Sequence, residues 1–401
     1  MGLCMRPLAP LPTAPTGFQF AYGRSQWPTT ENELIALQRL RRWVLPSDAV
    51  LHLPTLHQIE AGYALADPDV DQLLTERQSL LSVLQRTAQH ELDVRLQAQL
   101  CQHLPALDHR LAKIGAAAYR RYPLLQIWLL RNVALMAGYS IPALSTPLLA
   151  TGELVQQALP RLYRTYEFIQ AVSRPDALEI GGHTWRMCVQ VRELHARVRA
   201  GLRPTWNTAY WGEPINQSDM IATHLQFSLL ILLGYRGFGA ALSDEEQAGI
   251  LALWQQISTW LGVATDQVPL STHDALRWLY AYVSTQKLDY SLGRPLAQAL
   301  HDLPTQILGD HHPIAQWTET VNASITRLFV GDDIADGLGL PKPAVRHGLW
   351  AFPPLFFALE KTASSYPPLR QRLSQFAAWR QQRISDWMTQ YGQTPTHVGL
   401  K

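Results

Sequence analysis

The residues best suited to chemistry lie in two short segments near the middle of the chain. One segment carries Arg192 and His195, and the other carries His224. If the first segment is helical, this spacing puts the guanidinium and the imidazole on one face, where both can act on the same small ligand. If the second is helical, the face of the histidine also holds Met220, Ile221, Phe227, Ser228 and Ile231. An imidazole that projects into such an apolar layer needs a partner, and iron is one candidate.

Each of the three residues also has a plainer interpretation. A lone histidine on an apolar face is more often a core residue, satisfied by a hydroxyl or a carbonyl, than a metal ligand. Arg192 could form an ion pair with a neighbouring carboxylate. His195 could be an ordinary surface residue, because its segment is rich in charge and such helix faces are usually solvated. Spacing alone leaves these alternatives open.

Four stretches of sequence, including the two segments above, follow one another in a characteristic order between about Leu148 and Pro341. They are VRELHARVR, GEPINQSDMIATHLQFS, LGV with VPL between Leu261 and Leu270, and RLFVGDDIADGLGLP from Arg327 to Pro341. In this order they resemble the haem oxygenase family of the latex-clearing proteins and the MpaB-like oxygenases. The two segments with Arg192, His195 and His224 are the first two of these stretches.

The resemblance implies an oxidoreductase that depends on haem b and its iron. Such an oxygenase or dioxygenase would act with dioxygen on an apolar alkene or on an isoprenoid or lipid-type substrate. The resemblance also implies that His224 is the proximal, metal-binding ligand and that Arg192 lies on the distal side. In the latex-clearing enzymes a lysine follows that arginine by three residues, whereas this chain has His195 there. We therefore expect His195 in the distal pocket, either closing the iron as a second ligand or acting as a hydrogen-bond donor and base.

Other polar clusters are weaker candidates for a catalytic or metal-binding site. The catalytic glutamate of the latex-clearing proteins has no counterpart in a matching local motif, although three carboxylates precede the arginine, namely Glu167, Asp176 and Glu179. The pair His311 and His312 could bind a metal, yet it precedes Pro313 at an expected helix start, where surface histidines are common. The acidic run at Asp332, Asp333 and Asp336 lacks the spacing of an EF-hand and is interpreted as a structural turn.

Composition excludes several classes of function. Hydrophobic residues make up 47% of the 401 residues and charged residues only 16%, so material for a core is ample. The net charge is +2 and the basic residues are spread along the chain, which argues against nucleic acid as a partner. Cys4, Cys101 and Cys188 are far apart and form no CxxC pair, so neither a disulfide framework nor a zinc site is expected.

The cellular location is predicted from the length and continuity of the apolar segments. The N-terminal region has no apolar run of signal-peptide length, and the most apolar windows are too short or too interrupted to span a bilayer. We therefore expect a cytoplasmic protein with no transmembrane segment, for which peripheral contact with a membrane stays open. The oligomeric state is not predicted. A non-catalytic helical haem- or lipid-binding protein is the alternative function, and a helical protein without cofactor is a third.

Periodicity predicts an all-α protein, because helical patterns recur along the chain and no strand-type alternation is found. We expect an irregular N-terminal arm over residues 1–28, which contains five prolines, and one large helical domain over 29–401 with its motif-bearing core at about 148–341. The resemblance implies a globin-like core. Among the expected helices, that at 123–137 is apolar nearly all round, and one near 244–262 begins after Ser243. Gly138 to Pro147 is expected to be a connector.

Overall fold

The computed structural model describes residues 18–27, 53–72, 75, 108–151, 158–264, 267–345, 348, 352–366 and nine single positions between 368 and 386. Cys4, Cys101 and most of the proposed arm lie outside these residues. A helix predicted at 30–43 and most of one predicted at 369–391 also lie outside them.

Helices make up almost all of the regular structure in the described part of the chain, which confirms the all-α prediction. Its only β pairing is an isolated antiparallel bridge between Ser25 and Gln286. The first half contains α2 (Leu53–Tyr63), α5 (His109–Tyr119), α6 (Pro123–Leu129), η2 (Leu130–Leu135), α7 (Met136–Tyr139), α8 (Pro142–Thr151), α10 (Ala158–Val172) and α11 (His183–Leu202). The second half contains α12 (Thr208–Trp211), α13 (Gln217–Phe227), α14 (Leu229–Gly237), α15 (Asp244–Trp260), α16 (Thr272–Thr285), α17 (Tyr290–His301), α18 (Leu303–Leu308), α19 (Pro313–Phe329), α20 (Asp332–Gly337) and α21 (Phe352–Ser365).

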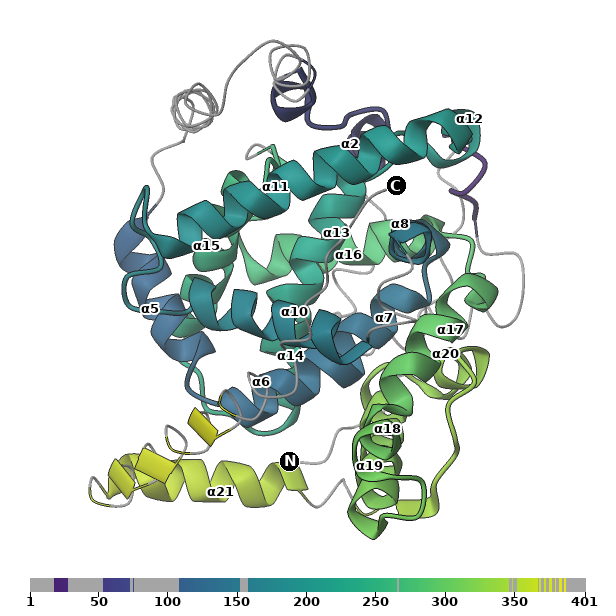
Figure 1. Ribbon diagram of the computed structural model, residues 1–401. Helices are drawn as coiled ribbons and strands as arrows, with labels where there is room; N and C mark the ends of the chain where they lie inside the picture. Colours follow the sequence, from purple (N-terminus) through teal and green to yellow (C-terminus); the bar gives the residue numbers. More distant parts are fainter. Residues whose placement is uncertain are drawn as a thin grey trace, which may run out of the picture.

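The helices enclose two large apolar clusters that share the middle of the molecule. One cluster is built mainly from α5, α6, η2, α14, α15 and α19, and the other mainly from α2, α13, α14 and α16. Figure 1 shows α11 lying across the upper part of the molecule, α13 and α14 in its centre and α17 to α20 at its lower right. The helix that carries His224 is therefore an interior element.

The stretch from Pro123 to Tyr139 is continuous helix and almost entirely buried, as its apolar sequence predicts. Its middle turn, η2, is a π-helix that includes the buried Arg131. The guanidinium donates to Asn132 Oδ1 at 2.9 Å and to the carbonyl of Leu300, and burial lowers its pKa to about 10. Within the described residues, no single helix has the length and apolarity to cross a membrane; Pro123–Tyr139 with Pro142–Ala150 passes only as a pair bent by 102°.

The expected connector at 138–147 is wrong, because α8 begins at Pro142 and continues through Pro147 to Thr151. A proline in a helix interior removes one backbone hydrogen bond, at a typical cost of about 3 kcal/mol. Packing offsets that cost here, since α8 lies against α7, α11, α13 and α17. Tertiary contacts, which a local sequence signal does not contain, decided this segment.

Helix α15 approaches α5 very closely and begins where the sequence predicts. A Cβ atom at Gly115 would lie only 1.9 Å from the carbonyl oxygen of Gly249, so both helices need glycine where they cross. The N-terminus has a complete capping box, in which the Ser243 hydroxyl accepts from the Glu246 amide and the Glu246 carboxylate accepts from the Ser243 amide. This packing holds α15 firmly beside the helices of the candidate site.

A buried polar network holds the N-terminus of α13. Arg24 donates two hydrogen bonds to Asp219, at 2.8 and 2.9 Å, and lies over the ring of Tyr63. The hydroxyl of Tyr282 donates to the same carboxylate at 2.7 Å, and the Asn216 side chain caps the helix by accepting from the Asp219 amide. Segment 18–27 and α16 are thereby anchored to the first turn of α13 through Asp219.

Candidate functional site

His224 has one satisfied and one unsatisfied ring nitrogen. Its side chain is 4% exposed, and Nδ1 lies 2.5 Å from Oγ of Ser258 on α15. Nε2 is buried and has no hydrogen-bond partner. A buried polar atom without a partner is unfavourable, so the folded chain presents a nitrogen that a ligand can satisfy.

The protonation of His224 follows from its surroundings. Burial lowers its pKa to about 3, while a backbone hydrogen bond to Trp254 acts more weakly in the opposite direction. The ring is therefore neutral at physiological pH. A proton on Nδ1 can be donated to the Ser258 hydroxyl oxygen or to a carbonyl, and this tautomer leaves the lone pair of Nε2 free.

Apolar and aromatic side chains surround the imidazole. Phe227, one turn after His224, stacks on Trp254 with ring centroids 5.3 Å apart. Ile221 and Leu225 on the same helix are fully buried. The α13 helix ends just beyond, at Ser228, whose hydroxyl donates to the carbonyl of His224. The histidine is thus held in an apolar layer, as its sequence pattern predicts.

Arg192 lies on α11, and its guanidinium is occupied. Nε and Nη2 donate to the two oxygens of Asp67 at 2.5 and 2.7 Å, and both side chains are buried. Asp71 of the same segment also pairs with two arginines, Arg199 on α11 and Arg203 directly after the end of that helix. The ion-pair alternative for Arg192 is therefore what the structure contains, although this does not test a role toward a bound ligand.

The Arg192–Asp67 pair depends on a glycine in the LGV motif. A Cβ atom at Gly262 would lie 2.1 Å from Asp67 Oδ2 and 2.6 Å from Arg192 Nε, and its φ of +87° favours glycine as well. Its carbonyl accepts a hydrogen bond from Gln217, the first residue of α13, at 2.9 Å. The motif therefore joins the His224 helix to the Arg192 helix.

His195 is half-buried on α11, one turn after Arg192, and its Nδ1 is a buried atom without a hydrogen-bond partner. Burial lowers its pKa to about 4, and the positive charges of Arg199 and Arg161 act in the same direction, while Asp67 opposes them. The ring is therefore neutral at physiological pH. It does not behave as a solvated surface residue.

The structure brings α11 and α13 to the same neighbours. Both helices pack against α15 and α8. No hydrogen bond joins the two imidazoles. Each keeps one buried nitrogen without a partner, at Nδ1 of His195 and at Nε2 of His224.

Sequence analysis missed two residues that support these side chains. Asp67 has a weak signal, because the acidic turn Asp67-Pro68-Asp69-Val70-Asp71 supplies the carboxylates that the arginines of α11 need. Ser258 has none, since a serine within an apolar helix is unremarkable in a sequence. Only the packing of α15 on α13 places its hydroxyl beside His224.

The other polar clusters singled out in the sequence, and Cys188, form no further candidate site among the described residues. Among the described residues no group of three or more His, Cys, Asp or Glu side chains could hold a metal, and His311 is exposed. Asp332 and Asp336 accept hydrogen bonds from Arg327, so the run is structural, but it forms the short helix α20 and not the expected turn. Cys188 is buried, and burial raises the pKa of its thiol.

Haem b fits the residues present at His224. An axial ligand must be a neutral imidazole on a rigid element, held at one nitrogen and free at the other, within apolar walls. His224 meets each of these conditions through Ser258, burial and the Phe227–Trp254 stack. The arginines near this site are already paired, because Arg192 and Arg199 each form an ion pair with a carboxylate.

Comparisons with known proteins identify the fold and the family of the chain. The solved structure of latex clearing protein LCP in the closed state superposes with a TM-score of 0.53 at 15% identity, covering 83% of this chain and 84% of that one, and shows a shared fold. No match was found among curated protein sequences. Residues 120–359 match the family described as ER-bound oxygenase mpaB/B'/Rubber oxygenase, catalytic domain. This match includes both candidate helices and more than half of the sequence, and the chain therefore belongs to that oxygenase family.

Proposed function

We propose that the protein is a haem b-dependent oxygenase that acts with dioxygen on an apolar alkene or on an isoprenoid or lipid-type substrate. Membership of the oxygenase family supports the class of reaction. The observation that carries the proposal is the state of His224, a buried neutral imidazole with Nδ1 held by Ser258 and Nε2 without a partner. Most buried side-chain polar atoms have a hydrogen-bond partner, so a buried Nε2 without one supports a ligand at this position.

In this proposal His224 is the residue that holds haem, through Nε2. Haem iron supplies the activation of dioxygen when it is bound. Ser258 keeps the imidazole in one orientation and one tautomer, as outer partners of metal-bound histidines do. The apolar side chains around the ring exclude water and favour an apolar substrate.

His195 is the second residue of the proposed site. Because its pKa is lowered to about 4, the ring is neutral and can either accept a proton at a nitrogen or donate its own N–H. The same neutral ring is able to coordinate iron. Arg192 acts mainly through its pair with Asp67, which holds α11 in position; its guanidinium is then a positioning group for His195 rather than a free cation.

The ion pair between Arg192 and Asp67 favours a second function, namely non-catalytic binding of haem or of a lipid by a helical protein. An oxygenase of the kind that the resemblance implies uses polar distal groups on dioxygen. With Arg192 bound to Asp67, only His195 remains on α11 as an uncommitted buried polar side chain among the residues named for the distal side. Haem binding without turnover would match that arrangement.

The decisive experiment is an absorption spectrum and an iron analysis of the purified full-length protein. We expect a Soret band and iron near one atom per chain. Oxygen consumption with an apolar alkene then separates the oxygenase from the binding protein. A colourless, iron-free protein that does not take up added haem would contradict both haem functions.

Electron paramagnetic resonance of the ferric protein tests His195. Two nitrogen ligands give a strong field, so coordination by His195 predicts a low-spin signal that becomes high-spin in His195→Ala. A high-spin signal in the native protein would instead support a role in hydrogen bonding. Identical spectra of both proteins, with equal turnover, would place His195 outside the site.

A further inference from the structure

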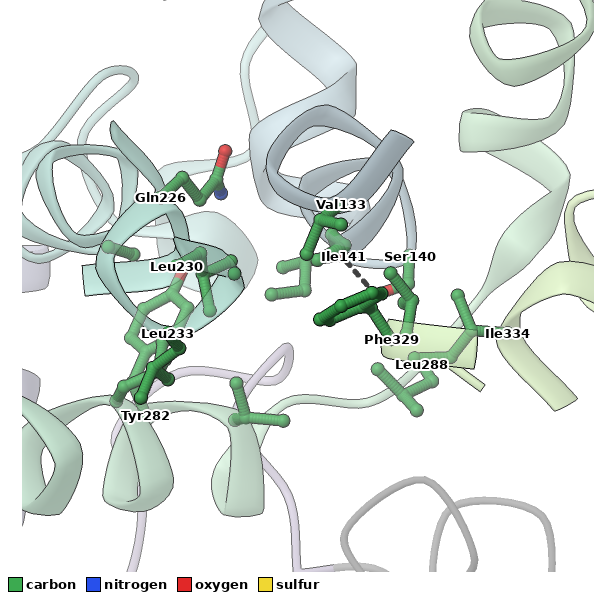
Figure 2. A pocket seen from close by; sticks show the side chains of 16 residues that line it. Val133, Ser140, Ile141, Gln226, Leu230, Leu233, Tyr282, Leu288, Phe329 and Ile334 are labelled. Carbon is green, nitrogen blue, oxygen red and sulfur yellow. Dashed lines mark hydrogen bonds between the residues drawn. The ribbon is translucent and has the colours of Figure 1, made fainter. Parts of the chain in front are cut away.

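A cavity lies between α13 and neighbouring helices, and none of its lining residues is on α15, the helix that contacts the His224 ring. Figure 2 shows its walls, which come from η2 and α7, from α13 and α14, from α16 and from the α19–α20 region. Most lining residues are apolar, among them Val133, Leu230, Leu233, Phe329 and Ile334. The centres of water-sized spheres can occupy about 100 Å³ of this cavity. One bound water needs about 10–15 Å³ on the same measure, so the space exceeds that of a single water molecule.

The cavity lies on the opposite face of α13 from His224. Ala222 and Gln226 line it, and they are one turn apart on the same side of the helix. At about 100° per residue, His224 stands about 200° from Ala222 and about 160° from Gln226. Its ring accordingly meets Ser258 on α15, an element that contributes no residue to the cavity. The two sites are separated by the thickness of one helix.

One polar side chain of the cavity wall is available to a ligand. Gln226 is 8% exposed and forms no side-chain hydrogen bond within the described residues, and its amide atoms are not among the fully buried polar atoms without a partner, so the amide is accessible from the cavity. The other polar side chains of the wall are satisfied: Ser140 donates to the carbonyl of Ala137 at 2.6 Å, and Tyr282 donates to Asp219 at 2.7 Å. A buried amide with free donors and acceptor is unfavourable unless a ligand or water pairs with it.

The amide of Gln226 lies close to Gly138. A Cβ atom at Gly138 would lie 2.7 Å from Oε1 and 2.9 Å from Nε2 of Gln226, so a larger residue there would displace the end of this flexible side chain. Figure 2 shows Gln226 pointing from α13 toward the element that carries Val133. The amide is therefore placed beside α7 at the cavity wall.

The residues that line the cavity disfavour a charged ligand. None of its sixteen residues is ionisable except Tyr282, which is held neutral because burial raises its pKa well above the usual value. A carboxylate or an ammonium group would lose its hydration there without gaining a counter-ion. A hydroxyl or carbonyl oxygen would lose much less, because it can accept a hydrogen bond from Nε2 of Gln226.

We propose that this cavity is a second ligand site, for a neutral long-chain alcohol or carbonyl compound whose oxygen pairs with Gln226. The hydrocarbon chain lies among the apolar side chains, and the helix that carries His224 forms one wall of the site. This site does not require haem and does not depend on the oxygenase function.

Isothermal titration calorimetry of the purified full-length protein with decan-1-ol tests the proposal. We expect one site per chain, with decanoate binding much more weakly because its charge has no partner. Gln226→Leu removes the hydrogen bond with little change of shape and should weaken decan-1-ol binding about threefold to tenfold. Gln255→Leu, on α15 outside the cavity, is the matched control and should leave the affinity unchanged.

Variants that fill the cavity test its location. Val283→Trp and Leu288→Trp, both at half-buried lining positions, should each abolish binding, whereas Val345→Trp at an exposed position should not. Circular dichroism identifies any variant that fails to fold, and the other filling variant then decides. His224→Ala should bind decan-1-ol normally, since the sites are separate. Undiminished binding in both filling variants, equal affinity for decanoate, or loss of binding in His224→Ala would each overturn the proposal.

Discussion

Helices α11 and α13 each carry a residue that the sequence singles out, but the fold treats the two residues in opposite ways. On α11 the guanidinium of Arg192 is fully engaged by both oxygens of Asp67. On α13 the imidazole of His224 is engaged at Nδ1 only, and Nε2 is buried without a partner. Both side chains are equally hidden from solvent, at 7% and 4% exposure, so burial alone does not distinguish them.

This comparison separates a structural role from a binding role. A buried polar side chain whose donors and acceptors are paired stabilises the packing of its helix. One that keeps an unpaired atom carries an energetic cost, which a bound ligand can remove. The Arg192 pair therefore positions α11, and His224 remains available. Four experiments test this difference.

The largest effect is expected from His224→Ala. The substitution removes the proposed axial ligand but only one side chain of the core, so haem should be lost while the helical circular dichroism spectrum is retained. His301→Ala is the matched control, because His301 is also partly buried with a lowered pKa but lies on α17. Full haem content and an unchanged spectrum in His224→Ala would show that another residue is the ligand.

Asp67→Ala should produce the largest loss of stability. It removes the buried counter-ion of Arg192 and leaves only the exposed Asp69 near the guanidinium, so we expect the free energy of unfolding to fall by about 3 kcal/mol, the lower end of the usual range. Chemical denaturation measures this. Asp69→Ala is the control, since Asp69 is 72% exposed and 3.8 Å from the same guanidinium, and a change within about 0.5 kcal/mol is expected. Equal effects of the two substitutions would mean that the Asp67 pair is not a structural anchor.

Ser258→Ala should weaken haem binding without abolishing it. Removal of a partner that orients a metal-bound histidine typically lowers affinity by about 10–100-fold. The control is Ser324→Ala, on α19, where a buried serine hydroxyl bonds only to a carbonyl of its own helix. Transfer of haem to an excess of apomyoglobin reports the relative affinities. If the two variants lose haem at the same rate as the native protein, Ser258 does not hold the ring.

The smallest effect concerns the pH dependence of stability through His195. Its pKa of about 4 in the folded protein lies below the value of about 6.5 of an unfolded chain, so the unfolded state binds more protons between these values. Stability from this group is therefore present above about pH 6.5 and is lost as pH falls toward 4. His195→Asn should flatten the slope of unfolding free energy against pH by at most about 1.4 kcal/mol per pH unit, less where solvent screens the ring. A slope in His195→Asn equal to that of the native protein would contradict the burial of its imidazole.

The sequence by itself determined the helical class, the family and the position of His224 in an apolar layer. These follow from local signals: helical periodicity, the Ser243 capping box, and motifs whose order runs from the Arg192 segment to Pro341. Burial of His224 could be predicted because its neighbours at helical spacing are apolar, and the face of a helix is a property of the sequence alone.

Only the tertiary structure decided which polar atoms are paired. Asp67 is 125 residues from Arg192, and Ser258 is 34 residues from His224, so no local pattern could predict either contact. The helical course of α8 through Pro147 also depends on packing against distant helices. Hydrogen bonds between helices depend on where whole elements dock, and docking is set by the sum of many apolar contacts rather than by the residues that finally meet.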